Sequence, residues 1–77
     1  MDTKHEHEIT IFINNKAFQT DKKEMTGLEI KALAGVPADY ELFLEKGDQT
    51  VPVANNEVVH LHEKIRFRAI PAGSFGA

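Results

Sequence analysis

Apolar and polar positions alternate along the first part of the chain, and this pattern predicts a pair of strands. In EITIFI, residues 8–13, isoleucine recurs at every second position, as expected for a strand with one buried face. The next two residues are asparagines, which tolerate the left-handed backbone of a two-residue hairpin loop. KAFQT, residues 16–20, is therefore predicted to return antiparallel, with Phe18 on the isoleucine face and Phe12 on the opposite face.

A polar loop over residues 21–25 is expected to lead into a short helix, TGLEIKALAG, residues 26–35. Thr26 and Glu29 have the spacing of a capping box, in which each side chain bonds the backbone of the other residue. The helix is expected to end at Gly35, which can adopt the left-handed conformation and is followed directly by Val-Pro. The apolar residues of the helix spread over a wide arc, which is typical of a helix that lies across a sheet.

Four more extended segments complete the pattern. They are DYELFLEKG (39–47), a strand ending in a turn; TVPV (50–53), a short edge strand; VVHLHE (58–63), a brief extended or one-turn segment after a polar loop; and KIRFRAI (64–70), the last strand. In the last strand, Ile65, Phe67 and Ala69 are expected to face the core, and Arg66 and Arg68 to face outward.

The order of these elements predicts an α+β fold. The single helix can bury its apolar arc only by crossing one face of a mixed sheet of four to five strands. The right-handed connection rule places the final strand beside the first strand and parallel to it.

This arrangement resembles the β-grasp fold of ubiquitin, and local sequence is similar too. Gly35, Val36, Pro37 and Asp39 match the glycine, isoleucine, proline and aspartate that precede the third strand of ubiquitin, and Thr26 matches the threonine that caps its helix. The pattern IFINNKAF, TGLEIKALAGVP, LFLEKG and VHLHEKIRFRAIP is similar to the bacterial multiubiquitin-type domains encoded beside genes for activating enzymes, conjugating enzymes and peptidases. The resemblance covers about residues 8–71.

The resemblance implies a protein modifier. An E1-like activating enzyme would adenylate the terminal carboxylate, an E2-like conjugating enzyme would carry it as a thioester, and an amine or hydroxyl on a target protein would accept it. A processing or deconjugating peptidase is a further implied partner, and copies of the domain could associate with one another. Gene neighbourhoods of this kind suggest bacterial defence against phage.

The C-terminal residues suit this role because most of them are narrow. We interpret residues 1–7 as a flexible N-terminal tail, 8–70 as the ubiquitin-like domain and 71–77 as a flexible conjugation tail. Glycine lets another backbone approach closely, and Pro71 favours an extended exit from the sheet. The expected conjugation residues are Gly73, Ser74, Phe75, Gly76 and Ala77.

The end of the chain departs from the Gly-Gly of ubiquitin and of the small sulfur carriers, because it reads Gly76-Ala77. Three interpretations stay open: a peptidase removes Ala77, Ala77 is itself activated, or natural residues follow it. Because the chain does not end in Gly-Gly, sulfur carriage through a thiocarboxylate is a weaker functional hypothesis. A noncovalent interaction module that uses only the folded surface is the main alternative to the modifier.

Partner proteins must also recognise a modifier, and we expect them to bind the outward face of the sheet. The alternation Leu-Phe-Leu-Glu favours Leu42 and Leu44 inward and Phe43 outward. Counting from Gly47 against ubiquitin gives the opposite facing, with Leu44 at the position of ubiquitin's patch isoleucine. The candidate partner-binding residues under the two alternatives are Phe12, Leu42, Phe43, Leu44, Arg66 and Arg68.

The composition of the chain favours some functional classes of protein over others. With 77 residues, 42% of them apolar, the chain can build one small core, which favours binding over catalysis. A net charge of −3 argues against nucleic acid as the main partner. The chain has no cysteine, and neither its charged start nor any apolar segment indicates export or membrane insertion, so we expect a cytoplasmic protein.

No motif for catalysis or for a cofactor is found. The sequence lacks a nucleophile elbow, a phosphate-binding glycine loop and a metalloprotease helix, so we expect no catalytic residue, no cofactor and no enzyme activity. The histidine pairs at 5 and 7 and at 60 and 62 match no closed metal site, and we interpret them as solvated side chains. Lysines, including Lys31, are interpreted mainly as solubilising charges.

Overall fold

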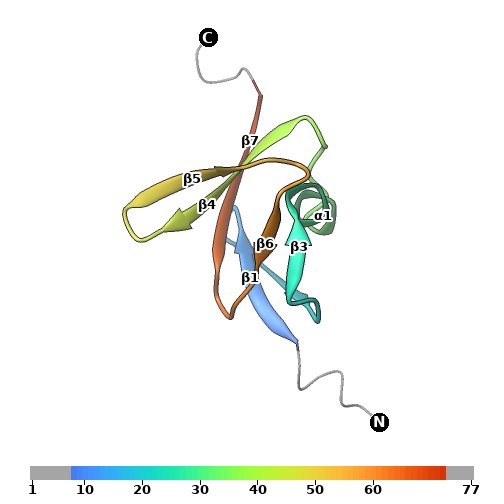
Figure 1. The fold of residues 1–77 in the computed structure, drawn as a ribbon, viewed down its shortest axis with the longest axis vertical. Helices are drawn as coiled ribbons and strands as arrows, with labels where there is room; N and C mark the ends of the chain where they lie inside the picture. Colours follow the sequence, from blue (N-terminus) through green and yellow to red (C-terminus); the bar gives the residue numbers. More distant parts are fainter. Residues whose placement is uncertain (1–7, 73–77) are drawn as a thin grey trace.

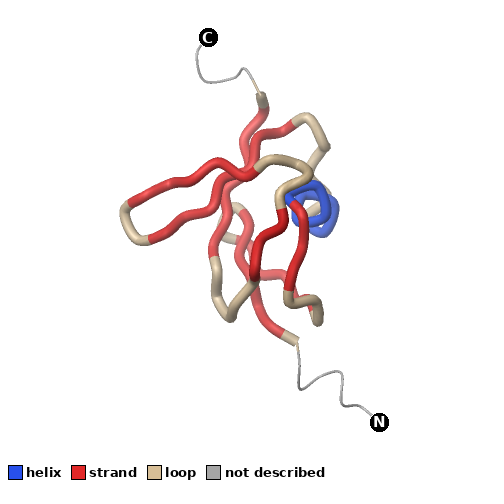
Figure 2. Tube along the Cα trace, in the orientation of Figure 1, coloured by secondary structure: helices blue, strands red, loops and turns tan. Residues whose placement is uncertain are grey.

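A five-stranded mixed sheet forms the body of the protein, and a helix lies to one side of it (Figures 1 and 2). The structure is a computed structural model that describes residues 8–72. Its elements are β1 (Ile9–Ile13), β2 (Lys16–Thr20), β3 (Glu24–Thr26), α1 (Gly27–Leu33), β4 (Tyr40–Lys46), β5 (Gln49–Val53), β6 (Val58–His60) and β7 (Arg66–Pro71).

The strand order in the main sheet is β2-β1-β7-β4-β5. β1 and β7 are parallel, and the other neighbouring pairs are antiparallel. The predicted α+β fold of the β-grasp type is therefore confirmed, including the parallel placement of the last strand beside the first. β5 lies at the edge of the sheet, where Pro52 costs no ladder hydrogen bond.

The first hairpin forms as its two asparagines predict. Asn14 and Asn15 have φ values of 54° and 68°, which are the left-handed conformations that a two-residue loop of this kind needs. Ile13 pairs with Lys16, and Ile11 lies opposite Phe18.

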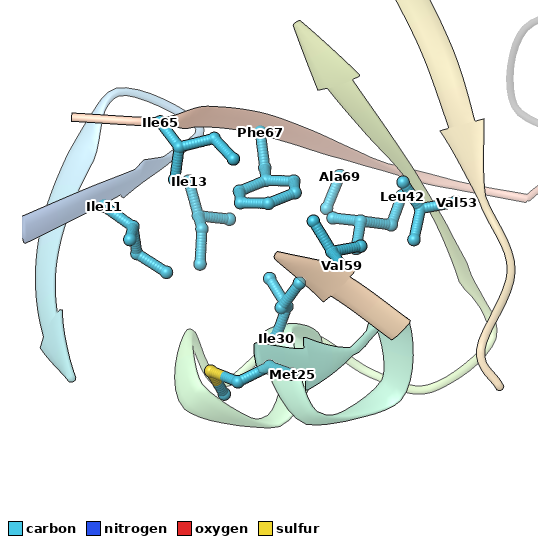
Figure 3. Close-up of a cluster of buried hydrophobic side chains, with 10 residues drawn as sticks. All are labelled: Ile11, Ile13, Met25, Ile30, Leu42, Val53, Val59, Ile65, Phe67 and Ala69. Atoms are coloured by element: carbon cyan, nitrogen blue, oxygen red, sulfur yellow. The ribbon is translucent and has the colours of Figure 1, made fainter. Parts of the chain in front are cut away.

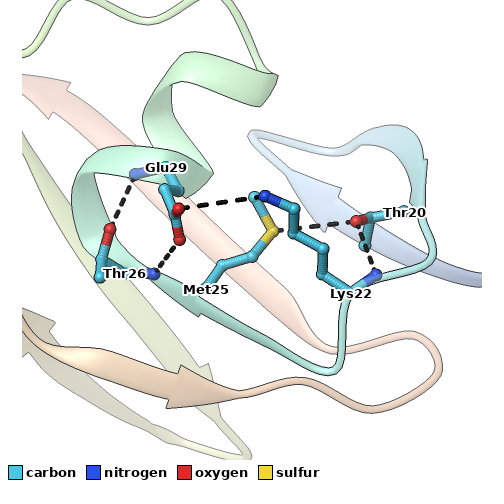
Figure 4. A network of polar contacts seen from close by, with 5 residues as sticks. All are labelled: Thr20, Lys22, Met25, Thr26 and Glu29. Carbon is cyan, nitrogen blue, oxygen red and sulfur yellow. Dashed lines mark hydrogen bonds and ion pairs between the residues drawn. The ribbon is translucent and has the colours of Figure 1, made fainter.

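The helix begins at the predicted capping box (Figure 4). The Glu29 amide donates to Thr26 Oγ1 over 3.2 Å, and the Thr26 amide donates to Glu29 Oε1 over 2.9 Å. Gly27 must remain glycine, because a Cβ there would collide with the carbonyl oxygen of Ala54. The helix ends before Gly35, whose φ of 73° is the left-handed stop that the sequence predicts.

A second, two-stranded sheet joins β3 to β6, and β3 was not predicted. The expectation that residues 21–25 form only a loop is wrong for its last two residues, Glu24 and Met25. Met25 pairs with Val59, and both side chains are buried. A three-residue strand is too short to show an alternating pattern, and its partner comes more than thirty residues later in the sequence, between Val58 and His60.

The core lies between α1 and the main sheet (Figure 3). Ile30 points from the helix toward the sheet, where Phe67 lies among the isoleucines of β1. The buried apolar residues are Ile11, Ile13, Met25, Ile30, Leu42, Val53, Val59, Ile65, Phe67 and Ala69.

One charged side chain is buried with this core, contrary to the interpretation of lysines as surface charges. Lys31, in the last turn of α1, is 2% exposed. Its Nζ donates to the carbonyl oxygens of Ala38 and Tyr40 over 2.7 and 2.6 Å. The ammonium therefore ties the helix to the chain that enters β4.

Candidate functional site

The face of the main sheet that points away from α1, called here the outer face, carries the aromatic and basic candidates. Ile11 and Ile13 are buried, so Phe12 between them points to the other side of the sheet. Phe67 and Ala69 are likewise buried on β7, while Arg66 and Arg68 are exposed. The predicted facing of the last strand is confirmed.

The structure decides between the two alternatives for β4. Leu42 lies opposite Ala69, and Leu44 lies opposite Phe67, whose side chains both point into the core. Because residues directly opposite each other share a face of the sheet, both leucines point inward and Phe43 points outward. The alternative that aligns this strand with ubiquitin by counting from Gly47 is therefore wrong. The facing predicted from the alternation of apolar and polar residues is correct.

This facing corrects two members of the candidate partner surface. Leu42 is 2% exposed and belongs to the core, so it does not lie on the outer face. Leu44 is half-buried and packs against the core from the inner face. Phe43 remains on the outer face, where it is half-buried and lies opposite Arg68.

Arg66 stacks on the ring of Phe12. The two residues are register neighbours on the parallel strands β1 and β7, and the guanidinium carbon lies 4.6 Å from the ring centroid. A cation–π contact of this kind is worth about 0.5–1 kcal/mol at an exposed site. Among the described residues, no carboxylate lies within ion-pair distance of Arg66.

Arg68 is held by an acidic residue that the sequence analysis did not select. Its Nε donates to Glu45 Oε2 over 2.9 Å. Both side chains are partly exposed, so the pair contributes little to stability, about 0–1 kcal/mol, but it fixes the direction of the guanidinium. The outward position of Glu45 follows from the same alternation that buries Leu44, and this signal was present in the sequence.

A small hollow of about 140 Å³ opens between these side chains. Its lining residues are Phe12, Asn14, Asn15, Glu45, Arg66, Phe67 and Arg68. The hollow is smaller than the clefts that hold cofactors or drug-sized ligands, which measure about 300–1,000 Å³. Its size and its mixed apolar and cationic lining suit a single side chain from a protein partner.

The side chain of Asn14 is hydrogen-bonded to β7. The prediction of Asn14 as a turn residue did not include this role. Its Oδ1 accepts from the Ala69 amide over 2.9 Å, and its Nδ2 donates to the Ala69 carbonyl over 3.1 Å. Its backbone amide donates to the Phe67 carbonyl over 3.0 Å. The side-chain amide thus continues the parallel β1–β7 ladder beyond the end of β1.

β7 continues to Pro71, and the described chain ends at the exposed Ala72. Pro71 is paired with Tyr40 at the end of β4, so the last strand stays in the sheet up to its final residue. The predicted conjugation residues, Gly73, Ser74, Phe75, Gly76 and Ala77, lie outside the described residues.

The described histidines have ordinary polar neighbours. His60 Nδ1 lies 3.2 Å from Glu24 Oε2, across the β3–β6 pair, and His62 Nδ1 lies 3.2 Å from the Glu63 carbonyl oxygen. Between residues 8 and 72, no three histidine, aspartate or glutamate side chains come together as a metal site would require. Within the same range, no helix is long and apolar enough to cross a membrane.

Comparison with known proteins gives one match. Residues 9–71 match the model of a family described as multiubiquitin, and this range covers all the strands of both sheets and the helix. No curated protein and no solved structure matches the chain.

Proposed function

The chain belongs to the multiubiquitin family, and we propose that it is a ubiquitin-like protein modifier whose C-terminal carboxylate is coupled to other proteins. In this proposal, an E1-like enzyme converts the carboxylate to an acyl adenylate with ATP, releasing pyrophosphate. An enzyme thiolate then displaces AMP to form a thioester. An E2-like enzyme accepts the acyl group by thioester exchange and passes it to an amine or hydroxyl on a target.

The observation that carries the proposal is how β7 is held. It lies between β1 and β4 at the centre of the main sheet, and Asn14 pairs with both backbone groups of Ala69. Pro71 is still paired with β4, and Ala72 is exposed. The residues that follow therefore start from a fixed point at the border of a rigid body, which is the geometry that presentation of a carboxylate requires.

The outer face supplies a surface by which enzymes of this pathway could recognise the modifier. Phe12 and Phe43 offer apolar area, and the guanidiniums of Arg66 and Arg68 are both oriented by contacts within the sheet. Aromatic and arginine side chains are the types that most often dominate binding energy at protein interfaces. Side chains that are already ordered lose less conformational entropy on binding.

The alternative is a noncovalent interaction module, and one set of variants separates the two. If the protein is a modifier, deletion of Gly76-Ala77 abolishes thioester formation with the cognate activating enzyme and ATP. If it is only a binding module, the same deletion leaves partner binding intact, while Phe12→Asp or Phe43→Asp destroys it. Asn56→Asp, in the exposed turn between β5 and β6, is a matched control for an added charge away from the outer face.

Deletion of Ala77 alone distinguishes two of the three interpretations of the C-terminus, activation at Ala77 and activation at Gly76. Loss of thioester formation means that Ala77 is the activated residue, whereas retained or faster formation means that Gly76 is. A sulfur carrier would instead gain the mass difference of one sulfur for one oxygen when it is incubated with its activating enzyme and a sulfur donor.

The biological setting is part of the same proposal. We place the modifier in the cytoplasm of a bacterium, with its enzymes and a processing or deconjugating peptidase encoded nearby, in defence against phage. The support for this setting is the resemblance to domains from such gene clusters. Deletion of the gene should leave growth unchanged and increase phage plaque numbers, and equal plaque numbers with and without the gene would refute the defensive role.

A further inference from the structure

A groove of about 360 Å³ lies at the end of the sheet opposite the exit of β7. The turn of the β4–β5 hairpin forms one wall, and the loop that leads into β7 forms the other; both elements can be followed in Figure 1. The lining residues are Leu44, Glu45, Lys46, Gly47, His62, Lys64, Ile65 and Arg66, and we call this site the basic groove.

The floor of the basic groove is apolar. Ile65 is 4% exposed and belongs to the core. Leu44 is half-buried and packs against the same core. An apolar side chain placed here would bury its own hydrophobic area and the exposed part of Leu44, at about 25 cal/mol per Å².

The rim of the basic groove is cationic. Lys46, Lys64 and Arg66 are all exposed and carry permanent positive charge, against one lining carboxylate, Glu45, in a protein whose net charge is −3. The local charge is therefore opposite in sign to that of the whole chain.

Two acidic residues beside these cations, Glu45 and Glu63, are directed to other partners. Glu45 Oε2 accepts from Arg68 over 2.9 Å. Glu63, next to Lys64 in the sequence, accepts from the Thr10 amide through its Oε1 over 2.9 Å. Among the described residues, no carboxylate lies within ion-pair distance of Lys46 or Lys64.

The loop holds Lys64 in an unusual backbone conformation. Its φ is 69°, in the left-handed region that lysine seldom adopts. The conformation is fixed by hydrogen bonds from the Lys64 amide to the Thr10 carbonyl, over 2.6 Å, and from the Ile65 amide to the His62 carbonyl, over 3.2 Å. A lysine at a position that glycine or asparagine would occupy with less strain points to a use for its side chain.

We propose that the basic groove binds an acidic segment of a partner protein. Carboxylates of that segment face Lys46 and Lys64, and one apolar side chain of the segment covers Leu44 and Ile65. Charge complementarity and the apolar floor together select this occupant over a nucleic acid, which would need a longer cationic track and offers no aliphatic side chain.

This site works independently of the C-terminus. Glu45 lies opposite Arg66 at one end of β7, and Tyr40 lies opposite Pro71 at the other end. At about 3.3 Å per residue, the basic groove is roughly 17 Å from the point where the chain leaves the sheet. A partner can therefore occupy the basic groove while the C-terminus is held elsewhere, and the proposal does not depend on conjugation.

The test uses the full chain labelled with ¹⁵N and the short peptide Glu-Asp-Leu-Asp-Glu, titrated to about 1 mM, a range that detects weak specific contacts. Two matched peptides replace the leucine by serine, or the acids by glutamine and asparagine. A short single-stranded oligothymidine is the nucleic acid probe. Amide shifts locate the binding site, and their concentration dependence gives Kd.

We expect shifts at the Lys46–Gly47 turn and at residues 62–66, and weaker binding of both matched peptides. Lys46→Gln with Lys64→Gln should weaken binding about tenfold, because two exposed charge contacts are lost. Lys16→Gln with Lys22→Gln makes the same change in net charge away from the basic groove and should leave Kd unchanged. The proposal is overturned if the shifts map elsewhere or are absent at the highest concentration, if both lysine pairs have equal effects, or if the oligothymidine binds the basic groove more tightly than the acidic peptide.

Discussion

The side-chain amide of Asn14 should be one of the main polar supports of β7, and replacing it by glycine tests this role. Asn14→Gly keeps the left-handed backbone, with its φ of 54°, and removes both hydrogen bonds to Ala69. Asn15→Gly is the matched control, because Asn15 has a φ of 68° and makes no side-chain hydrogen bond among the described residues. Both variants change the same residue type at adjacent positions of one turn.

The expected difference in stability between the two variants follows from the two hydrogen bonds that only Asn14 makes. Each hydrogen bond contributes about 0.5–1.5 kcal/mol to stability, so the two bonds of Asn14 contribute about 1–3 kcal/mol. Glycine also changes the backbone entropy of the unfolded chain and relieves the left-handed strain, but these effects apply to both variants and largely cancel in the comparison. Asn14→Gly should therefore be less stable than Asn15→Gly by about 1–3 kcal/mol.

Two measurements check this value. Urea unfolding gives the free energy of unfolding of each variant, and native-state hydrogen exchange reports the Ala69 amide directly. That amide should exchange about tenfold faster or more in Asn14→Gly, because its acceptor is gone. Equal stability of the two glycine variants, with unchanged exchange at Ala69, would refute the assignment of Asn14 as a support of the last strand.

Four further substitutions test other parts of the fold by urea unfolding. Gly27→Ala should cost about 1–3 kcal/mol, because its methyl group would meet the Ala54 carbonyl, and a neutral result would contradict this close approach. Lys31→Met should cost about 2 kcal/mol, because it leaves two carbonyl oxygens without their donor, and a stabilised variant would show that the buried ammonium is a net burden. Leu42→Ala should cost about 2–5 kcal/mol and Phe43→Ala about 1 kcal/mol or less, and the reverse order would overturn the facing of β4.

Features encoded by neighbouring residues could be predicted from the sequence. The two asparagines of the first turn, the pair Thr26 and Glu29 and the stop at Gly35 each act within a few residues, and all of them form as expected. The alternation in the last strand also gave the correct faces, because both faces of that strand differ clearly in polarity.

Features that depend on distant partners could not be predicted in the same way. β3 exists only because β6, more than thirty residues later in the sequence, pairs with it. The bonds between Asn14 and Ala69 join residues 55 positions apart, and no local pattern encodes them. The basic groove likewise combines a hairpin turn and a loop that are separate in the sequence.

The central claim is that this β-grasp body presents a carboxylate to an activating enzyme. Incubation of the full chain with the proposed E1-like activating enzyme and ATP, followed by intact-mass analysis without reductant, tests this claim most directly. We expect a covalent adduct of the two proteins that dithiothreitol releases and that requires both ATP and the C-terminal residues. An activating enzyme that forms a thioester with another substrate but none with this chain would contradict the claim.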